Sequence, residues 1–543
     1  MNCFPRCEDA GMNFVTYRRL MVLLLCLAFA SAGFAQQPFL TGRSDNQRTS
    51  ANNVETFLTP ANVNKNSFGR LFNYPLDYQS LAQPLYVPNV AVPGKGTHNV
   101  VYVATMADTV YAFDADSNQG ANSTPLWQVN FTDPANGITT ASVATHTLPC
   151  ASTETSGTGF TQEGIVATPV IDPNTSTMYV VAKTLENGTV RHRLHALDIT
   201  NGQEKFGGPV LISGSSISNA GHVTVFNSLH QKNRPGLLLN NGAVYIAFGS
   251  NLCNDGNSGW VLSYSASNLQ RIGIFNTSPD RGLVSIWQTG QALPIDVDGN
   301  IYLETGESGV NGFDVPAGGQ TYCNSVIKLN PSLLDSHNQY LVADYFTPSN
   351  IAYLNANDLD LSASGSLVLP DQDGPYPHEL LVGGKQGIVY LLNRDSLGMY
   401  SSPDQVLQQF ALVPGVNNDV LMSSAAYWNQ TVYFAPNGSP LLAYPLSGGL
   451  LGTPVKTAGK YPGSHSPSIS ANGNTNGILW VIAGKLYAFD AVTLKLLYNT
   501  AQNSTRDALP AVSHFITQTV ANGRVYVATR TTLEVYGLFQ DWN

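Results

Sequence analysis

The chain has 543 residues, of which 11% are charged and 43% are hydrophobic, and its formal net charge is −10. Intrinsic disorder is excluded, because disordered chains combine few apolar residues with a high net charge. Nucleic-acid binding is excluded as well, because phosphate recognition needs a basic stripe and the longest basic cluster is Arg18-Arg19. The 49 glycines and 31 prolines fall short of the fraction that marks low complexity, so they are interpreted as turns.

The beginning of the chain has the pattern of an export signal. An arginine pair precedes an apolar run at residues 20–30, and small residues then lead to Ala35. This order is typical of a secretory signal peptide, and a run of about eleven residues is too short to cross a hydrocarbon core of about 30 Å as a helix. A buried N-terminal helix is the alternative. We predict that residues 1–35 are a signal peptide and that the protein is exported to the periplasm or the outside of the cell, without a transmembrane anchor.

Three cysteines lie beyond the predicted signal: Cys150, Cys253 and Cys323. An odd count allows at most one internal disulfide, and the sequence leaves the pairing open. A fold of this length does not depend on disulfides in the way that small secreted domains do. No CxxC, CxxCH or CxxC…HxxxH spacing occurs, so neither a zinc site nor a covalently attached haem has support.

One phrase recurs along the chain: an aliphatic and aromatic strand, a short turn, and a second strand that ends in Tyr-Ala-Phe-Asp or a variant. The first copy is residues 101–105 with 110–114, and the last is residues 525–529 with 533–536. Such Val-, Ile- and Tyr-rich runs bounded by turn residues indicate strands. No segment keeps a helical apolar period, so we predict an almost wholly β protein. The six copies in between begin at Met178, Val244, Ile301, Leu380, Val432 and Leu479.

Eight copies predict an all-β fold, an eight-bladed β-propeller of four-stranded repeats. The last copy has no outer strand after it, whereas residues 68–74 precede the first blade and resemble the outer strand of other blades. We therefore predict that this N-terminal strand completes the C-terminal blade. A linear β-solenoid is the alternative, and it would not need that strand. Residues 57–543 are expected to form the single propeller domain, and residues 36–56, rich in Gln, Ser and Asn, a flexible lead-in.

The repeat also resembles that of a known family. The phrase VYVATMADTVYAFDAD at residues 101–116, with TNGQEKF after RLHALDI at residues 193–206, resembles the pyrroloquinoline quinone (PQQ) repeat of the quinoprotein alcohol dehydrogenase-like propellers. The resemblance covers about residues 57–540, and the whole chain is similar to secreted PQQ-repeat propellers. It implies the fold and says little about chemistry, because one fold hosts many functions.

In the dehydrogenases of this family a tryptophan packs on the quinone, oxygen ligands hold calcium, and a basic hairpin residue contacts the reactive carbonyl. The resemblance implies that Trp287, upstream of IYLETGE, packs on PQQ, and that Lys385, in GGKQGIVYLLNRD, contacts the carbonyl. Asp358 and Asp360, in NANDLDLSASG, resemble the family's paired aspartates, of which one removes the alcohol proton. The residues at positions of calcium ligands are Asn254 or Asp255, Glu307 and Asp358.

The same residues have simpler interpretations. Asp358 and Asp360 can satisfy turn amides, Lys385 can be an exposed hairpin lysine, and Trp287 can belong to the core. The chain also departs from the family pattern, because it has no adjacent cysteine pair and no c-type haem domain, and Glu307 stands where the family has asparagine. An added carboxylate beside a tricarboxylate cofactor is unfavourable unless a cation neutralises it.

Two functions follow from these observations. The first is a non-catalytic exported propeller that presents its loops and central funnel to an unidentified protein, peptide or glycan. The second is a calcium- and PQQ-dependent oxidoreductase for an alcohol or a sugar. The first is favoured because the resemblance is strongest in scaffold residues. The two are separated by whether Trp287, Glu307, Asp358 and Lys385 converge on the central channel at one face.

Overall fold

Short β-strands form almost all of the regular structure, as the repeated phrases predict. The computed structural model describes Met1 and residues 37–142, 161–250, 258–306, 313–461, 463 and 465–539. The predicted signal peptide, apart from Met1, lies outside the described residues, as do Cys150 and Cys253. Residues 38–543 form one compact unit. Within the described ranges, no helix combines the length and the apolarity needed to cross a membrane.

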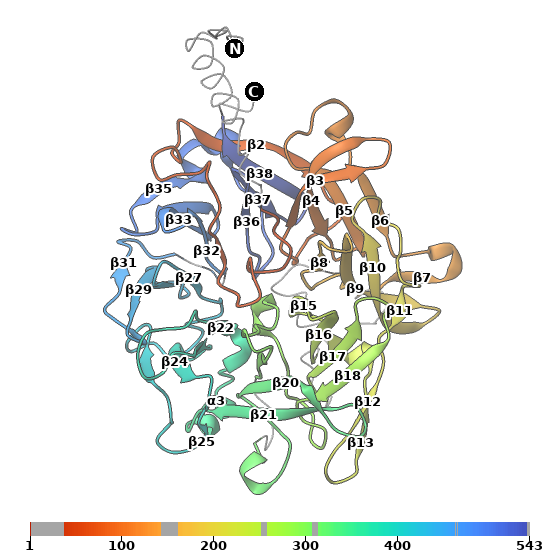
Figure 1. Cartoon of the computed structure of the whole chain (residues 1–543), viewed down its shortest axis with the longest axis vertical. Coiled ribbons are helices and arrows are strands. Elements are labelled where there is room, and N and C mark those ends of the chain that lie inside the picture. The colour runs from red at the N-terminus through yellow and green to blue at the C-terminus, as the bar shows by residue number, and fades with distance from the viewer. Residues whose placement is uncertain are drawn as a thin grey trace. The chain divides into compact units, whose positions relative to one another are not determined.

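The described strands assemble into the eight blades of a propeller, which confirms the predicted fold. Figure 1 shows the blades following one another around a ring in chain order. Blade 1 contains β3 (Leu85–Val92), β4 (Gly96–Ala104), β5 (Thr109–Asp114) and β6 (Trp127–Asn130); blade 2 contains β7 (Ile138–Thr140), β8 (Val170–Asp172), β9 (Thr177–Glu186), β10 (Thr189–Asp198) and β11 (Val210–Leu211); blade 3 contains β14 (Gln231–Lys232), β15 (Leu238–Asn240), β16 (Ala243–Ser250), β17 (Trp260–Ser265) and β18 (Arg271–Asn276); blade 4 contains β19 (Ile301–Glu304), β20 (Val326–Leu334), β21 (Tyr340–Thr347) and β25 (Met399–Tyr400).

Blade 8 joins the two ends of the propeller. Its outer strand β2 (Phe68–Pro75) pairs antiparallel with β38, with Phe68 opposite Leu538 and Tyr74 opposite Leu533. The predicted closure by an N-terminal strand is therefore confirmed, and a linear solenoid is excluded. Blade 5 contains β22 (Leu367–Val368), β23 (Glu379–Gly383), β24 (Ile388–Asn393) and β26 (Gln408–Ala411); blade 6 contains β27 (Ala426–Trp428), β28 (Thr431–Phe434), β29 (Leu442–Ser447), β30 (Leu450–Leu451) and β31 (Val455–Lys456); blade 7 contains β1 (Ala51–Asn52), β32 (Ser468–Asn472), β33 (Thr475–Ile482), β34 (Leu486–Asp490) and β35 (Leu496–Asn499); blade 8 also contains β36 (Thr519–Ala521), β37 (Arg524–Ala528) and β38 (Thr532–Leu538).

The tyrosine of the repeated phrase links neighbouring blades. The Tyr102 hydroxyl in blade 1 donates to the carbonyl of Ile199, which follows the third strand of blade 2, at 3.0 Å. Equivalent bonds join blade 2 to blade 3, blade 6 to blade 7, and blade 8 to blade 1. A buried tyrosine hydroxyl needs such a partner, so the repeated tyrosine is a structural requirement of the blade junction. The other donor and acceptor pairs are Tyr179 and Ala266, Tyr433 and Ala491, and Tyr526 and Ala115.

Residues 38–56, which we call the channel segment, do not form the expected flexible lead-in. Arg48 and Ser50 are almost completely buried, and Figure 1 shows the segment as a red-brown trace across the centre of the ring. The segment hydrogen-bonds in chain order to the inner strand or inner edge of all eight blades. The partners are Tyr86 in blade 1, Ile171 in blade 2, Leu239 in blade 3, Ile295 in blade 4, Val368 in blade 5, Tyr427 in blade 6, Ile469 in blade 7 and Val520 in blade 8.

The difference has a physical reason. Gln, Ser and Asn side chains are typical of solvated segments, but they also suit a polar channel lined by strand edges, whose buried amides and carbonyls need partners. Asn46 bonds to two blades in this way, because its side-chain amide donates to the Leu239 carbonyl and its backbone carbonyl accepts from the Ile295 amide. Composition alone does not distinguish the two environments.

We predict that a chain beginning at residue 57 is less stable than one beginning at Pro38. Each lost hydrogen bond removes about 1 kcal/mol of stability, so the free energy of unfolding should fall by several kcal/mol, measured by urea denaturation. A synthetic peptide of residues 38–56 should restore part of the loss. Equal urea midpoints for the two chains would contradict this role.

Two buried histidines make the fold sensitive to acid. His465 Nδ1 donates a hydrogen bond to the Ile516 carbonyl at 3.2 Å, and burial lowers the pKa of His465 to about 4. Burial and the nearby Lys183 also hold the pKa of His192 well below its usual value. Both imidazoles are therefore neutral in the native protein at neutral pH.

We predict that stability falls as the pH is lowered from about 6.5 towards about 4. The unfolded chain takes up the His465 proton near pH 6.5 and the native chain only near pH 4, so acid favours unfolding by up to about 3 kcal/mol for this residue. Denaturation at a series of pH values should show a flatter slope in His465→Gln. Exposed His337 provides the control, His337→Gln, and an unchanged slope in the His465 variant would overturn the assignment.

Candidate functional site

The fold brings the described candidate residues to one end of the propeller. In each blade the turn between the second and third strands emerges at the same end as the connection that leads into the first strand. Trp287 and Asp360 lie in the connections into blades 4 and 5, and Lys385 lies in the turn between β23 and β24. We call this end the loop face.

Trp287 lies close to the propeller axis. Its ring contacts Phe515, from the connection into blade 8, with centroids 6.4 Å apart and planes at 86°. Blades 4 and 8 are on opposite sides of an eight-bladed ring, so a contact between their connections must lie near the axis. Lys232 Nζ is 5.6 Å from the centroid of the Trp287 ring. The indole is only partly buried, so it is not a simple core residue.

Lys385 is held between two carboxylates. Its Nζ is 2.6 Å from Asp360 Oδ2 and 2.8 Å from Asp358 Oδ1. The side chains of Lys385 and Asp360 are 17% and 25% exposed, whereas that of Asp358 is 75% exposed. Burial opposes the charge on the amine, but the two carboxylates outweigh it and raise the pKa of Lys385. Lys385 is therefore a protonated, positioned donor rather than a free hairpin lysine.

Trp287 and Asp360 lie at the starts of two adjacent turns. Trp287 directly precedes the 3₁₀ turn Gln288–Gly290, Asp360 directly precedes the 3₁₀ turn Leu361–Ala363, and the two turns contact each other. The chain after β19 of blade 4 also passes close to Asp360, because a Cβ on Gly306 would lie only 2.5 Å from Asp360 Oδ1. The chain therefore passes Asp360 at a distance that only glycine allows.

The structure describes only one of the four predicted metal ligands. Asn254, Asp255 and Glu307 lie outside the described residues. Asp358 is described, and it contacts Lys385. No group of three or more His, Cys, Asp or Glu side chains in the described part of the chain could hold a metal ion. The predicted calcium site therefore stays a prediction.

A buried charged cluster beside Trp287 was not predicted from the sequence. Glu163 contacts Lys183 Nζ at 2.5 Å through Oε1 and Lys232 Nζ at 3.1 Å through Oε2, and all three side chains are at most 3% exposed. The two lysines outweigh the effect of burial and lower the pKa of Glu163. The three groups together carry one net positive charge beside the indole. A lysine inside the apolar strand β9, in VVAKTLE, is the signal that could have indicated the cluster.

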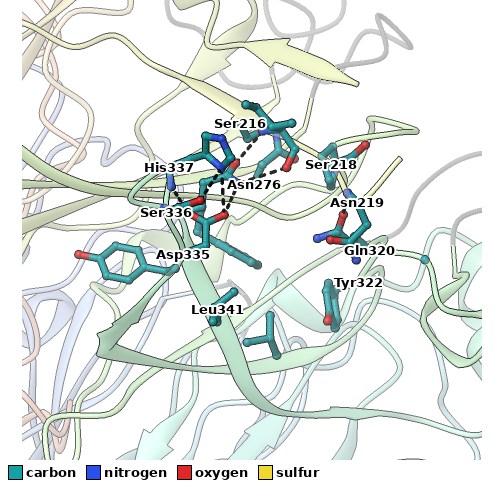
Figure 2. Close-up of a pocket in the computed structure, with 17 residues that line it drawn as sticks. Ser216, Ser218, Asn219, Asn276, Gln320, Tyr322, Asp335, Ser336, His337 and Leu341 are labelled. Carbon is teal, nitrogen blue, oxygen red and sulfur yellow. Dashed lines mark hydrogen bonds and ion pairs between the residues drawn. The ribbon is translucent and has the colours of Figure 1, made fainter. Parts of the chain in front are cut away.

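A hollow lies at the outer rim of the propeller, between blades 3 and 4. It has a volume of about 630 Å³, and its walls are the hairpin of β12 (Ser215–Ile217) and β13 (Val223–Val225), strand β18, and the turn between β20 and β21. Figure 2 shows Ser216, Ser218 and Asn219 of the hairpin on one side and Asp335 and Leu341 on the other. We call it the rim groove. Gln320, Tyr322, Ser336 and His337 also line it.

The rim groove is rigid and polar. The Gln339 side chain joins its two walls, accepting from the Ile217 amide at 2.6 Å and donating to Asp335 Oδ2 at 2.7 Å. Ser216 and Asn276 are 3% and 6% exposed, and Ser216 Oγ and Asn276 Nδ2 have no hydrogen-bond partner among the described residues. Buried polar atoms without a protein partner are rare.

Comparison with solved structures supports the fold. A quinohaemoprotein alcohol dehydrogenase from Comamonas testosteroni superposes with a TM-score of 0.59 at 14% identity over 93% of this chain and 81% of that chain. A second, from Pseudomonas putida HK5, gives 0.60 at 12% identity over the same shares. A europium-containing methanol dehydrogenase gives 0.60 at 12% identity over 92% of this chain and 98% of that one.

No family model matches the chain, and no curated protein matches it. Identities this low carry the fold and not the chemistry. The resemblance seen in the repeated phrases is nevertheless confirmed at the level of the fold: the chain is an eight-bladed β-propeller, and its fold is similar to that of these quinoprotein dehydrogenase structures.

Proposed function

We propose that the loop face binds a quinone cofactor of the PQQ type together with a cation, and that the protein oxidises an alcohol or a sugar there. The observation that carries the proposal is the arrangement of Trp287, Asp360 and Lys385. Trp287 and the ion-paired Asp360 directly precede two turns that contact each other at one face. Trp287, Asp358 and Lys385, the described residues of the set of four, lie at this face, which supports the oxidoreductase among the two functions that the sequence left open.

The charges around Trp287 suit an anionic planar ligand. The partly exposed indole offers a ring face for stacking, and the lysine pair on Glu163 leaves one net positive charge beside it. A buried cation close to a binding surface attracts an anionic ligand strongly, because little water screens it. PQQ carries three carboxylates, so its acid groups would lie on this side of the indole.

The Asp360 and Lys385 pair supplies the proton chemistry. A bound quinone would accept the hydride from the substrate carbon. The Asp360 carboxylate accepts the proton of the substrate hydroxyl as general base. Lys385, at 2.6 Å, holds that carboxylate in place. Its raised pKa means that the amine donates hydrogen bonds over the whole physiological pH range.

The cation would be held by Asp358 with Asn254 or Asp255 and Glu307. Calcium prefers six to eight oxygen ligands, and Asp358 is exposed enough to turn from Lys385 towards an ion. A carboxylate at position 307 adds negative charge to the ligand set, so a trivalent ion deserves the same test as calcium. The predicted export signal places this chemistry in the periplasm or outside the cell.

We predict that the purified mature chain binds PQQ in the presence of Ca²⁺ or Eu³⁺ and then reduces a dye with an alcohol or sugar substrate. Asp360→Asn should lower kcat by about 100-fold or more, because a general base contributes at least that factor, with PQQ affinity changed only a few-fold. Lys385→Met should lower both kcat and the affinity for PQQ. Binding is measured by equilibrium dialysis and turnover by dye reduction.

Asp373→Asn provides the matched control, because this exposed aspartate belongs to the same blade but to the turn at the opposite end. Its binding and turnover should equal those of the wild type. If the wild-type chain binds no PQQ with either ion, the proposed function is wrong.

The rim groove favours a second function, binding of an oligosaccharide without catalysis. Its lining is rich in hydroxyl and amide groups, which match the hydroxyl groups of sugars, and Tyr322 adds a partly exposed ring. Ser216 Oγ and Asn276 Nδ2 are unpartnered in the described structure and can bond to a ligand at little cost in desolvation. The volume lies within the usual range for ligand sites.

We predict that a glycan array identifies at least one oligosaccharide that binds the chain. Asn276→Leu should weaken this binding by about tenfold or more, because the loss of one buried hydrogen bond in such a site costs about 1.4 kcal/mol or more. Ser336→Ala, at the exposed side of the groove, should change the affinity by less than about threefold. Binding that survives Asn276→Leu would exclude the groove. PQQ binding should be the same in both variants, so the two functions are tested separately.

A further inference from the structure

The hairpin of β12 and β13 stands apart from the blades. Its two strands form a sheet of their own, in which Ser216 is opposite Thr224 and Ile217 is opposite Val223. Figure 1 shows the hairpin at the periphery of the ring. Because no blade continues this sheet, the backbone groups along each of its two outer edges need partners from elsewhere.

The outer edge of β12 has such a partner. The Gln339 side chain accepts from the Ile217 amide at 2.6 Å and donates to the Ile217 carbonyl at 3.2 Å. The backbone groups of Ile217 therefore point away from β13. In an antiparallel pair the opposite residue, Val223, then points its own backbone groups outward on the other side. Val225 lies two residues further on, so its amide and carbonyl lie along the same outer edge of β13.

The outer edge of β13 is open in the described structure. Within the described ranges the amides and carbonyls of Val223 and Val225 have no hydrogen-bond partner. Their side chains are also 62% and 66% exposed. The strand is nevertheless held in place from its other face, since Thr224 Oγ1 donates to the Pro279 carbonyl at 2.7 Å. A fixed strand thus presents a free edge and two apolar side chains.

The sequence around this edge carries none of the usual protection. Exposed edge strands are normally kept from pairing by lysines, other charged side chains, prolines or bulges. Residues 206–231 contain no Asp, Glu, Lys or Arg, and β13 itself is Val-Thr-Val. Copies of a chain with a net charge of −10 repel each other over most of their surface. They can approach each other along an uncharged strand.

The charges at the two ends of the hairpin have opposite signs. Arg271 Nη1 donates to the Ser213 carbonyl at 2.9 Å, close to the end of β13. Asp280 Oδ1 contacts His222 Nδ1 at 2.8 Å, immediately before the start of β13. Two antiparallel copies of the strand would therefore bring the basic end of each copy towards the acidic end of the other. This charge complementarity favours a second copy of the chain as the occupant of the edge.

We propose that β13 pairs with β13 of a second copy about a two-fold axis at Thr224. Val223 of each copy then exchanges N–H···O bonds with Val225 of the other, as expected for an interface that uses the same surface on both subunits. The pairing is short, so the dimer is weak and depends on concentration. Because Ser216 and Ser218 also line the rim groove, the dimer brings two such grooves near its axis. The inference is independent of both proposed functions.

The first test is sedimentation velocity of the mature chain from about 1 µM to about 100 µM, the range in which a weak dimer forms. The mean mass should rise from that of a monomer towards that of a dimer. The double variant Val223→Lys with Val225→Lys should stay monomeric at every concentration, with an unchanged circular dichroism spectrum. Val492→Lys is the control, because Val492 is also 66% exposed but lies in the turn between β34 and β35. It should dimerise as the wild type does.

A disulfide test locates the axis. In the proposed pair the two copies of residue 224 face each other with Cα atoms about 4.5 Å apart, which lies within the range that a disulfide can bridge. Thr224→Cys should therefore give a covalent dimer on mild oxidation, whereas Val492→Cys should not. A monomeric wild type at the highest concentration would overturn the proposal and leave the edge to another partner. A dimer that survives the double lysine variant would overturn it as well.

Discussion

The inner edge of the propeller is the constraint on which the rest of the structure depends. The innermost strand of a blade has one edge that no strand of its own blade covers, and its amides and carbonyls need partners because they are buried. The channel segment supplies these partners to all eight blades in chain order. One short stretch of chain thereby fixes the ring from inside, while β2 closes it from outside.

The same segment supports the candidate site. Arg43 and Arg234 share a cavity, and Arg234 packs so closely on Gly290 that a Cβ there would lie 1.9 Å from its Nη1. Gly290 ends the turn that Trp287 begins. Arg234 therefore lies between the cavity that it shares with the channel segment and the turn that follows Trp287. A substitution in the channel segment should therefore change the position of Trp287 at the loop face, even though the substituted residue does not contact Trp287.

Much of the fold could be predicted from the sequence, because its signals are local. The tyrosine of VYVAT belongs to a phrase that repeats along the chain. The strand that begins at Phe68 resembles the outer strand that the last copy of the phrase lacks. The channel segment could not be predicted, since its polar composition fits solvent as well as a polar channel. The Glu163, Lys183 and Lys232 cluster could not be predicted either, because residues from blades 2 and 3 meet only after the ring has closed. Trp287, Asp360 and Lys385 were identified from motifs, but the contact of Trp287 with Phe515 depends on the ring.

Two charged clusters, one beside Trp287 and one around Lys385, have net charges of opposite sign. Glu163 with its two lysines carries a net charge of +1, and Lys385 with Asp358 and Asp360 carries −1. In a chain with so few charged residues, two such clusters of opposite charge would orient an anionic ligand bound near Trp287. Its acid groups would lie towards blades 2 and 3, and a cation would lie towards blade 5, because low local screening strengthens both attractions.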